Sequence, residues 1–499
     1  MGVIKRFFSK EIKLNMDGKF DLREAAKRTR ILDVNSRYFG LETSVLMENA
    51  GRGVADEISR RFGSGKKIGI FCGTGNNGGD GLVVTRHLMD KNEVTLYFLG
   101  HPKEIQTDEA KKNWQVLEHT PLKKFLIQDS TELSRYDFGQ FDIIVDGMLG
   151  IGISGDPREP FKSTIQKINT TKAKKICIDL PTGYGSNTSV KSDLTVSFHF
   201  QKVEGAEVLT LGVPLELENR IGPGEVKFLE KRKRDAHKGQ GGRVMIIGGS
   251  SFFRGALEYA GRAAAKIADL VYTCAPEPCS GTVEKIPDFL GTCLPGDFLS
   301  EAHLPEILRR IDQYRCDSIL IGPGLGLGPE MGIKEETKKM VIGLVRELKE
   351  IKIVIDADGL NAISDHLETL KENVVLTPHR GEFKRLSGQE PKAENAAAFA
   401  KKYRCIVVLK APVDIVSNGT KTKFNFTGNP GMATGGTGDI LSGAIAGFAS
   451  TNDLFDSSLA ATFVTGLAGD MVQKEKGHYF TSTDVLGKLS EAIRWAEEF

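Results

Sequence analysis

The sequence predicts an α/β protein with two domains, and three observations support this. The chain has 499 residues. This is longer than a single hydrophobic core usually accommodates, because domains contain about 100–200 residues. Short, continuous apolar segments alternate with helical segments, which is typical of a mostly parallel sheet covered on both faces. The alternation stops near residue 229, where glycine, proline and charged residues gather, and then starts again. We therefore predict domains at 1–228 and 229–499.

The first domain is predicted to open with a helix over residues 41–62, because apolar residues recur there on one helical face. The segment 108–119 also predicts a helix. Apolar runs predict strands around these helices, at 67–73, 93–100, 141–150, 174–183 and 193–200. The first twenty residues lack this periodicity and are expected to form a loose tail.

The second domain repeats the pattern and is predicted to end in two long helices, at 438–450 and 457–476. Strands are predicted at 242–250, 270–276, 317–326, 352–360, 374–378, 405–410 and 414–419. In open sheets of this kind, ligands bind beyond the carboxyl ends of the strands. The clusters of glycine, asparagine and aspartate follow those ends, so we expect the chemistry there.

Composition and charge exclude several classes of protein. The net charge is only +2, so no global field predicts binding to nucleic acid or membrane. The basic run Lys231–Arg234 is interpreted as a solvated linker. No apolar run approaches the ~18 residues of a membrane span. The seven cysteines are never spaced as CxxC and predict buried, reduced thiols in a cytoplasmic protein.

The first glycine-rich turn, Gly73–Gly78, fits GxGxxG between a strand and a helix. That context favours phosphates held by backbone N–H groups at a helix start. A nicotinamide cofactor used for hydride transfer also needs an acid at the end of the second strand. Glu93 lies ahead of that strand instead. Ordinary NAD-dependent hydride transfer is therefore disfavoured.

Polar side chains crowd the predicted strand ends in this domain. They are Asn76, Asn77, Asp80, Asp146, Asp179 and Thr182. Together their oxygens predict a pocket for an alkali or alkaline-earth cation and a polyhydroxylated ligand. Each residue alone could instead be a turn former or a helix N-cap.

Four motifs, LMENAG at 46–51, NNGGDG at 76–81, DGMLGIG at 146–152 and DLPTG at 179–183, follow the order seen in NAD(P)H-hydrate epimerases, so residues 25–225 resemble that family. The resemblance implies a Rossmann-like three-layer domain, K+ bound by Asn77, Asp146 and Thr182, and Asp179 as general acid/base. It also implies contacts with the hydrated dinucleotide from Asn76, Asn77, Gly78, Gly79, Asp80, Gly150, Ile151, Gly152, Ile153, Ser154, Gly155, Asp156 and Asp179. The loop after Thr182 is shorter than is usual in the family, with Tyr184 where leucine is common.

The second glycine-rich turn lies within Asn429–Phe448, where Gly435, Gly436 and Gly438 precede an apolar helix. Inward-facing backbone N–H groups there would form a site for a transferring phosphoryl group. Asp439 stands beside them, placed to take a proton from an attacking hydroxyl. The alternative is that Asp439 is only an N-cap.

Residues 235–499 resemble the ribokinase-type fold and, more narrowly, ADP- or ATP-dependent NAD(P)H-hydrate dehydratases. The motifs are HKGQGGRVMIIGGS at 237–250, GPGLG at 322–326, DADGLNAI at 356–363, TPHRGEF at 377–383 and GGTGD at 435–439. The resemblance implies that hydrated NADPH contacts Ala256, Gly326, His379 and Asp439. It implies that ADP contacts Lys410, Ala411, Pro412, Val413, Asp414 and Gly438. Lys410-Ala411-Pro412 departs from the usual Leu-Lys-Gly pattern, and His379 could instead be structural.

These resemblances predict one bifunctional repair enzyme, both isomerase and lyase. One half interconverts the R and S hydrates of NADH and NADPH, with K+. The other dehydrates the S form using ADP or ATP with Mg2+, giving NAD(P)H, phosphate and AMP or ADP. The alternatives are a ribokinase-like kinase for a small molecule with a non-catalytic N-terminal domain, and a non-enzymatic scaffold. We also expect a homo-oligomer.

Overall fold

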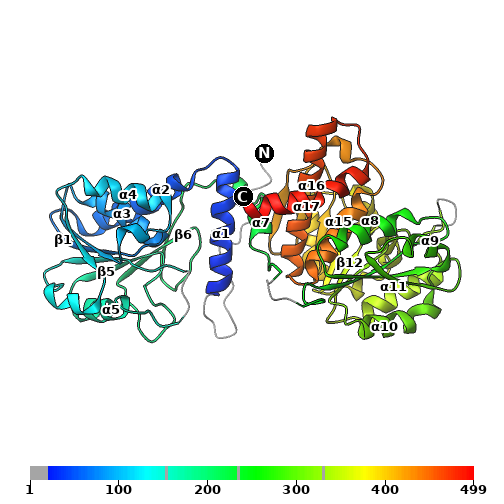
Figure 1. Ribbon diagram of the computed structural model, residues 1–499, viewed down its shortest axis with the longest axis horizontal. Coiled ribbons are helices and arrows are strands. Elements are labelled where there is room, and N and C mark those ends of the chain that lie inside the picture. The colour runs from blue at the N-terminus through cyan, green and yellow to red at the C-terminus, as the bar shows by residue number, and fades with distance from the viewer. Residues whose placement is uncertain (1–20, 152–154, 233–236, 329–331) are drawn as a thin grey trace. The chain divides into compact units, whose positions relative to one another are not determined.

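The computed structural model describes residues 21–151, 155–232, 237–328 and 332–499 (Figure 1). Contacts divide the described chain into two compact units, one ending at Glu218 and the other comprising Asn219–Phe499. The segment before residue 229 packs within the second unit, because Ile221 N donates to Phe424 O at 2.9 Å. The predicted linker residues Lys231 and Arg232 pair there with Glu497 and Asp269. The tail predicted for residues 1–20 lies outside the described residues.

The first unit is a seven-stranded parallel sheet with the order β3-β2-β1-β4-β5-β6-β7. The strands are β1 Lys67–Cys72, β2 Glu93–Leu99, β3 Lys123–Ile127, β4 Ile143–Gly147, β5 Lys174–Ile178, β6 Leu194–Phe198 and β7 Glu207–Leu209. The order reverses between β1 and β4, and ligands bind beyond such a switch point in folds of this class. The predicted parallel sheet is therefore confirmed.

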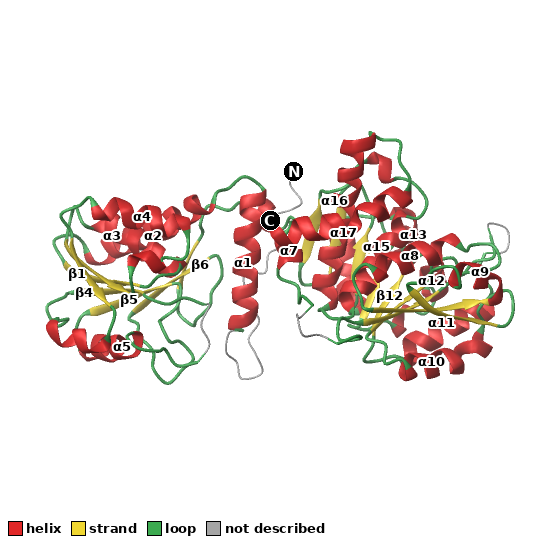
Figure 2. Cartoon of the chain, in the orientation of Figure 1, coloured by secondary structure: helices red, strands yellow, loops and turns green. Residues whose placement is uncertain are grey.

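Helices cover both faces of this sheet (Figure 2). They are α2 Thr43–Phe62, α3 Asn76–Leu88, α4 Asp108–Glu118 and α5 Phe161–Thr170. The unit also contains α1 Leu22–Tyr38, which packs against the short α6 Leu215–Glu218. One buried cluster joins α2, α3 and α4 to the sheet, and a second joins α5 to the opposite face. The three-layer arrangement predicted for this half is observed.

Helix α3 begins earlier than the sequence predicts, so NNGGDG forms its first turns instead of a loop before it. Gly78 explains why a glycine-rich segment is needed inside a helix. A Cβ atom at this position would lie 1.9 Å from the carbonyl oxygen of Gly73. The motif therefore brings the helix start against the loop that follows β1.

The second unit contains a nine-stranded sheet with the order β10-β9-β8-β11-β12-β13-β14-β15-β16. The strands are β8 Arg243–Ile247, β9 Leu270–Pro276, β10 Phe289–Leu294, β11 Ser318–Ile321, β12 Lys352–Ile355, β13 Val374–Leu376, β14 Ile406–Leu409, β15 Asp414–Ser417 and β16 Thr422–Asn425. The sheet is parallel except at β15 and β16, which pair antiparallel. Its order reverses between β8 and β11, which places a second switch point there.

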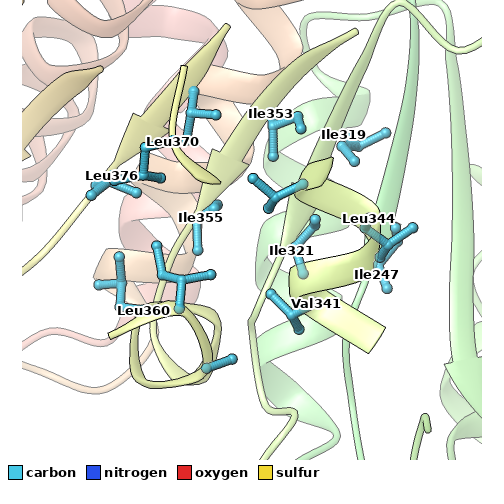
Figure 3. Packing of buried hydrophobic residues seen from close by; sticks show 14 of the residues in the cluster. Ile247, Ile319, Ile321, Val341, Leu344, Ile353, Ile355, Leu360, Leu370 and Leu376 are labelled. Carbon is cyan, nitrogen blue, oxygen red and sulfur yellow. The ribbon is translucent and has the colours of Figure 1, made fainter. Parts of the chain in front are cut away.

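The helices of the second unit pack on both faces of its sheet. They are α7 Gly224–Lys227, α8 Gly255–Ala265, α9 Ser280–Val283, α10 Leu304–Gln313, α11 Glu335–Glu347, α12 Asp358–Ile363, α13 Arg380–Ser387, α14 Ala393–Tyr403, α15 Thr437–Ala449, α16 Leu454–Lys476 and α17 Ser482–Glu498. Figure 3 shows Ile319, Ile321, Ile353 and Ile355 of the sheet beside Val341 and Leu344 of α11. The prediction that two long helices end the chain was incomplete, because α17 follows them.

The apolar face predicted for α15 is confirmed. Ile440, Leu441, Ala444, Ile445 and Phe448 are all buried. All seven cysteines are free thiols, and all except Cys293 are buried. Within the described residues, no helix is both long and apolar enough to cross a membrane.

Helix α15 packs closely against α8, and Gly443 lies at the contact. A Cβ atom there would lie 2.1 Å from the carbonyl oxygen of Ala260. We expect Gly443→Ala to destabilise the second unit by about 1–3 kcal/mol, because backbone cannot move aside as a side chain can. Gly487→Ala is the matched control. Gly487 lies in α17 with no atom within 4 Å of its Cβ position, so alanine should stabilise by about 0.5–1 kcal/mol.

Calorimetric unfolding of both variants measures the two effects. Equal melting temperatures for the two variants would contradict the close packing of α15 on α8.

Candidate functional sites

Asp146 ends β4 and is fully buried. Its Oδ1 accepts hydrogen bonds from Thr182 Oγ1 at 2.6 Å and Met148 N at 3.2 Å, and its Oδ2 accepts one from Thr182 N at 2.8 Å. Burial raises the pKa of Asp146, while these hydrogen bonds act in the opposite direction. The structure therefore brings two of the three predicted cation ligands into direct contact.

Asn77 lies in the first turn of α3 and is 7% exposed. Neither its amide nitrogen nor its amide oxygen has a hydrogen-bond partner among the described residues. A Cβ at Gly150 would lie 3.3 Å from the Asn77 Cβ. Leaving a buried amide unsatisfied costs about 1–3 kcal/mol. An absent ligand is therefore the simplest explanation, and an oxygen-binding cation such as K+ fits the amide oxygen.

Asp179 follows β5 and has a left-handed backbone, with φ of +64°. Its N–H donates to Val196 O and its carbonyl accepts from Ser197 Oγ, both at 2.8 Å. Its carboxylate contacts the ammonium group of Lys202, whose side chain is 1% exposed. The sequence analysis did not identify Lys202.

Two further carboxyl groups, those of Asp80 and Asp33, interact electrostatically with Asp179 and Lys202. Burial, with the charges of Asp179 and Asp33, raises the pKa of Asp80 well above its usual range, and Lys202 opposes this. Burial also raises the pKa of Asp33 on α1 to about 7, again opposed by Lys202. Asp33 was missed because it lies in a helix that the sequence analysis did not predict.

The loop 150–156 carries the other residues predicted at this site, and the structure describes only part of it. Asp156 Oδ1 accepts a hydrogen bond from Asn187 N at 2.9 Å, so this carboxylate ties its loop to the loop after Thr182. Gly150, Ile151 and Gly155 lie in the same loop. Gly152, Ile153 and Ser154 lie outside the described residues, so their predicted role stays a prediction.

In the second unit, Gly436 is the N-cap of α15 and adopts a left-handed φ of +99°. Gly438 and Asp439 lie in the first turn that follows. A Cβ at Gly438 would lie 3.3 Å from Lys410 Nζ, which places that ammonium beside the helix start. Burial and the charges of Asp356 and Asp358 raise the pKa of Asp439 to about 7, and Lys410 opposes this.

Lys410 follows β14 and bonds Asp356 Oδ1 at 2.7 Å. Burial alone would lower the pKa of Lys410, but Asp356, Glu382 and Asp439 raise it. Asp356 is 2% exposed at its side chain and follows β12. Asp356 and Asp358 belong to the motif DADGLNAI, but the sequence analysis assigned neither a role. Their position just after the apolar run Ile353–Ile355 was the signal that could have found them.

Gly326 is held from both sides. Its N–H donates to Asp358 Oδ2 at 2.8 Å, and its carbonyl accepts from Ser250 Oγ at 2.6 Å. A Cβ at the neighbouring Gly324 would lie 3.5 Å from Ala256 Cβ. The loop that carries Gly326 therefore adjoins the start of α8, which carries Ala256, and Asp358 connects that loop to the surroundings of Asp439.

His379 is the N-cap of α13. Its Nδ1 accepts from Gly381 N at 3.0 Å and from Glu382 N at 3.3 Å, and its backbone pairs with Lys410. The structural interpretation of His379 is thus supported, and contact with substrate stays a prediction. Asp414 accepts from Ala411 N at 3.0 Å and from Asn425 Nδ2 at 3.1 Å. It fixes the turn 410–414, which also holds Pro412 and Val413.

Within the described residues, no group of three or more histidine, cysteine, aspartate or glutamate side chains is arranged to hold a metal. This observation does not bear on K+, for which amide, hydroxyl and carbonyl oxygens also serve as ligands. The site in the first unit is a cluster of carboxyls, an amide and a lysine, and the site in the second unit is a helix start with a lysine and aspartates.

Two family models match the chain. Residues 43–204 match the YjeF-related protein N-terminus, and residues 244–491 match NAD(P)H-hydrate dehydratase. The chain is 36% identical over 495 residues to the bifunctional NAD(P)H-hydrate repair enzyme of Archaeoglobus fulgidus, covering 95% of this chain and 99% of that protein. The same-named protein of Methanocaldococcus jannaschii is 36% identical over 487 residues, covering 94% and 93%.

A solved structure is also similar to the second unit. It is the ADP/ATP-dependent NAD(P)H-hydrate dehydratase from Bacillus subtilis, co-crystallised with ATP and Mg2+. That protein is 22% identical, with a TM-score of 0.45, covering 56% of this chain and 98% of that chain.

The raised pKa of Asp439 predicts a pH-dependent stability. Its pKa is about 7 in the folded chain against an ordinary value of 3.8, so ionisation costs the folded state free energy as pH rises between these values. Asp439→Asn cannot ionise. We expect its free energy of unfolding, relative to the unmodified chain, to increase between about pH 4 and about pH 8, by an amount on the order of a few kcal/mol.

Urea unfolding at several pH values measures this difference. Asp365→Asn, at an exposed position of the same unit, is the matched control. A difference between Asp439→Asn and the unmodified chain that stays constant with pH would contradict the raised pKa.

Proposed function

The chain belongs to the family of bifunctional NAD(P)H-hydrate repair enzymes, and we propose how its two sites divide the work. The first unit epimerises the hydrated nicotinamide nucleotides. The second dehydrates the S form at the expense of ADP or ATP. A stand-alone small-molecule kinase is not favoured, because relatives named for both activities match nearly the whole chain.

For epimerisation, we propose that Asp179 is the general acid/base. In the hydrate, C6 of the ring carries both the ring nitrogen and a hydroxyl group. Protonation of that hydroxyl lets water leave while the nitrogen lone pair stabilises the carbon. Water then returns to the other face and a base removes its proton, so no atoms or electrons are gained or lost. A fixed carboxyl beside C6 can serve both steps.

We propose that K+ is held by Asn77, Asp146 and Thr182. The support is the buried amide of Asn77, which has no partner among the described residues. When bound, the cation would supply positive charge beside the buried carboxylate of Asp146. The residues themselves hold the loop that follows β4, because Leu149 N donates to Thr182 Oγ1 at 3.0 Å. The remaining predicted contacts, at Asn76–Asp80 and Gly150–Asp156, would then hold the dinucleotide.

For dehydration, we propose that Asp439 removes the proton of the 6-hydroxyl as that oxygen attacks the terminal phosphorus of the nucleotide. The observation that carries this proposal is the place of Asp439 in the first turn of α15, next to Gly438, whose Cβ position lies 3.3 Å from Lys410 Nζ. Burial also raises the pKa of Asp439 to about 7, and a general base works best with a pKa near the operating pH. The N–H groups at the start of α15 and the Lys410 ammonium would stabilise charge on the transferring phosphoryl group.

Phosphate then leaves C6 as a proton leaves C5, which restores the double bond. Mg2+ would enter with the nucleotide, since this ion is usually held by substrate phosphates and one or two carboxylates. Asp356 and Asp358 are the carboxylates whose charges act on Asp439, so they are the ones proposed to hold the ion. Ala256, Gly326 and His379 would contact the hydrate, and Lys410–Asp414 with Gly438 the adenine nucleotide.

Replacing one proposed catalytic aspartate at a time tests the division of labour. With ADP, Asp439→Asn should lose about 100-fold or more of its turnover of the S hydrate, because its base is gone. It should still epimerise. Asp179→Asn should do the reverse and leave the R hydrate unconsumed. The near-ultraviolet absorbance of regenerated NADH reports dehydration of each separated hydrate.

Each variant is the control for the other. Full dehydration by Asp439→Asn would refute the assigned base. A stable phosphorylated product in place of free phosphate would favour the kinase alternative.

Exchange of K+ for Li+ tests the cation site. Epimerisation by the unmodified chain should slow severalfold in Li+, and Asn77→Ala should be slow in both salts, because the amide ligand is missing. Dehydration of the S hydrate by the same preparation is the internal control. Equal epimerisation rates in K+ and Li+ for the unmodified chain would rule out the proposed cation.

A further inference from the structure

Lys202 is a buried cation that the proposed function leaves without a role. Its side chain is 1% exposed and its ammonium contacts Oδ1 of Asp179, whose side chain is 12% exposed. Burying a lysine is costly unless the charge is paired and well hydrogen-bonded. We therefore expect this buried ion pair to serve a purpose at its own site. The partner of Lys202 in the pair is Asp179, the proposed acid/base.

The same segment fixes Asp179 at its backbone. Asp179 N donates to Val196 O at 2.8 Å, and Ser197 Oγ donates to Asp179 O at 2.8 Å. Val196 and Ser197 belong to β6, and Lys202 follows that strand by four residues. The left-handed φ of Asp179 is thus stabilised by β6, while Lys202 determines where its carboxylate points.

The charges around this pair are mostly negative. Asp33 from α1 and Asp80 from α3 interact with both Asp179 and Lys202. Asp80 also acts on the Cys72 thiol at the end of β1, whose pKa is raised by burial and by the charges of Asp146 and Asp80. Three carboxyls, those of Asp33, Asp80 and Asp179, therefore interact with one another in a poorly solvated place, and the Lys202 ammonium opposes their charge.

A cluster of carboxyls in a poorly solvated place favours their protonated form, because like charges at close range there cannot all ionise. Asp80 and Asp33 follow this rule, as their raised pKa values show. A contact with a buried ammonium is what distinguishes Asp179 from them. That contact fixes the orientation of the Asp179 carboxylate.

We propose that Lys202 is a positioning residue for epimerisation, holding Asp179 as an oriented carboxylate toward C6 of the hydrated nicotinamide ring. The proposal rests on the proposed epimerase function of this unit. Lys202 itself exchanges no proton with the substrate. Asp179 protonates the leaving hydroxyl, and the carboxylate so formed, held by Lys202, then accepts the proton of the incoming water.

The test compares Lys202→Met with Lys202→Arg, using separated R and S hydrates at saturating K+. Lys202→Met should lower kcat for epimerisation about 100-fold and change KM less than about threefold. Its acid limb in the pH profile of kcat should move to higher pH, because the carboxylate has lost its cation. Lys202→Arg should recover part of kcat and return the acid limb toward its original position.

Lys175→Met is the matched control. Lys175 is a buried lysine of the same sheet whose ammonium donates to the carbonyls of Thr171 and Ala173, both at 3.0 Å. It should keep kcat and the pH profile. Calorimetric unfolding of each variant confirms that the first unit is folded in the assay.

The outcomes separate this inference from the function it rests on. If the unmodified chain does not epimerise, the proposed function fails. If it does, an unchanged kcat and pH profile in Lys202→Met overturns the role of Lys202. A loss expressed only in KM would also overturn it, because Lys202 would then bind substrate. Equal losses in Lys202→Met and Lys175→Met would show a purely structural role.

Discussion

The carboxyl ends of parallel strands gather aspartates in both units, and a buried or largely buried lysine balances part of that charge in each. Lys202 contacts Asp179 in the first unit, and Lys410 contacts Asp356 in the second. Carboxylates that leave water without such a partner take up protons instead. The position of each lysine therefore determines which aspartate is held in direct contact with a cation at each site.

The two lysines are used differently. Lys202 contacts the proposed catalytic carboxylate directly, which suits a site that adds and removes water at one carbon. Lys410 bonds a neighbouring aspartate and leaves Asp439 with a pKa of about 7. Its ammonium also lies beside Gly438, at the helix start. In the proposed mechanism this arrangement would place the base and a phosphate-binding cation side by side, as phosphoryl transfer requires.

The sequence predicted what depends on local pattern and missed what depends on distant packing. Central strands such as β1 and β4 were found because they are continuously apolar, whereas β3 and β7 were not, because most of their side chains are exposed. Asp146 was found because it lies at the carboxyl end of a strand, Asp179 because it directly follows one, and Asp439 because it directly follows a glycine turn. Lys202 and Asp33 have no such neighbour, and only the packing of α1 and β6 gives them a role.

Hydrogen bonding also divides the motif residues into those that hold the scaffold and those left for a ligand. His379 and Asp414 direct their polar atoms to nearby backbone N–H groups or to Asn425, and both backbone groups of Gly326 are already bonded. The N–H of Gly326 is therefore already used, whereas its carbonyl oxygen can accept one further hydrogen bond. The Asn77 amide, by contrast, has no partner among the described residues. Motif membership alone cannot make this distinction, because a residue that shapes a site and one that binds in it occur in the same motifs. The atoms that the fold leaves unsatisfied are the better guide to where a ligand binds.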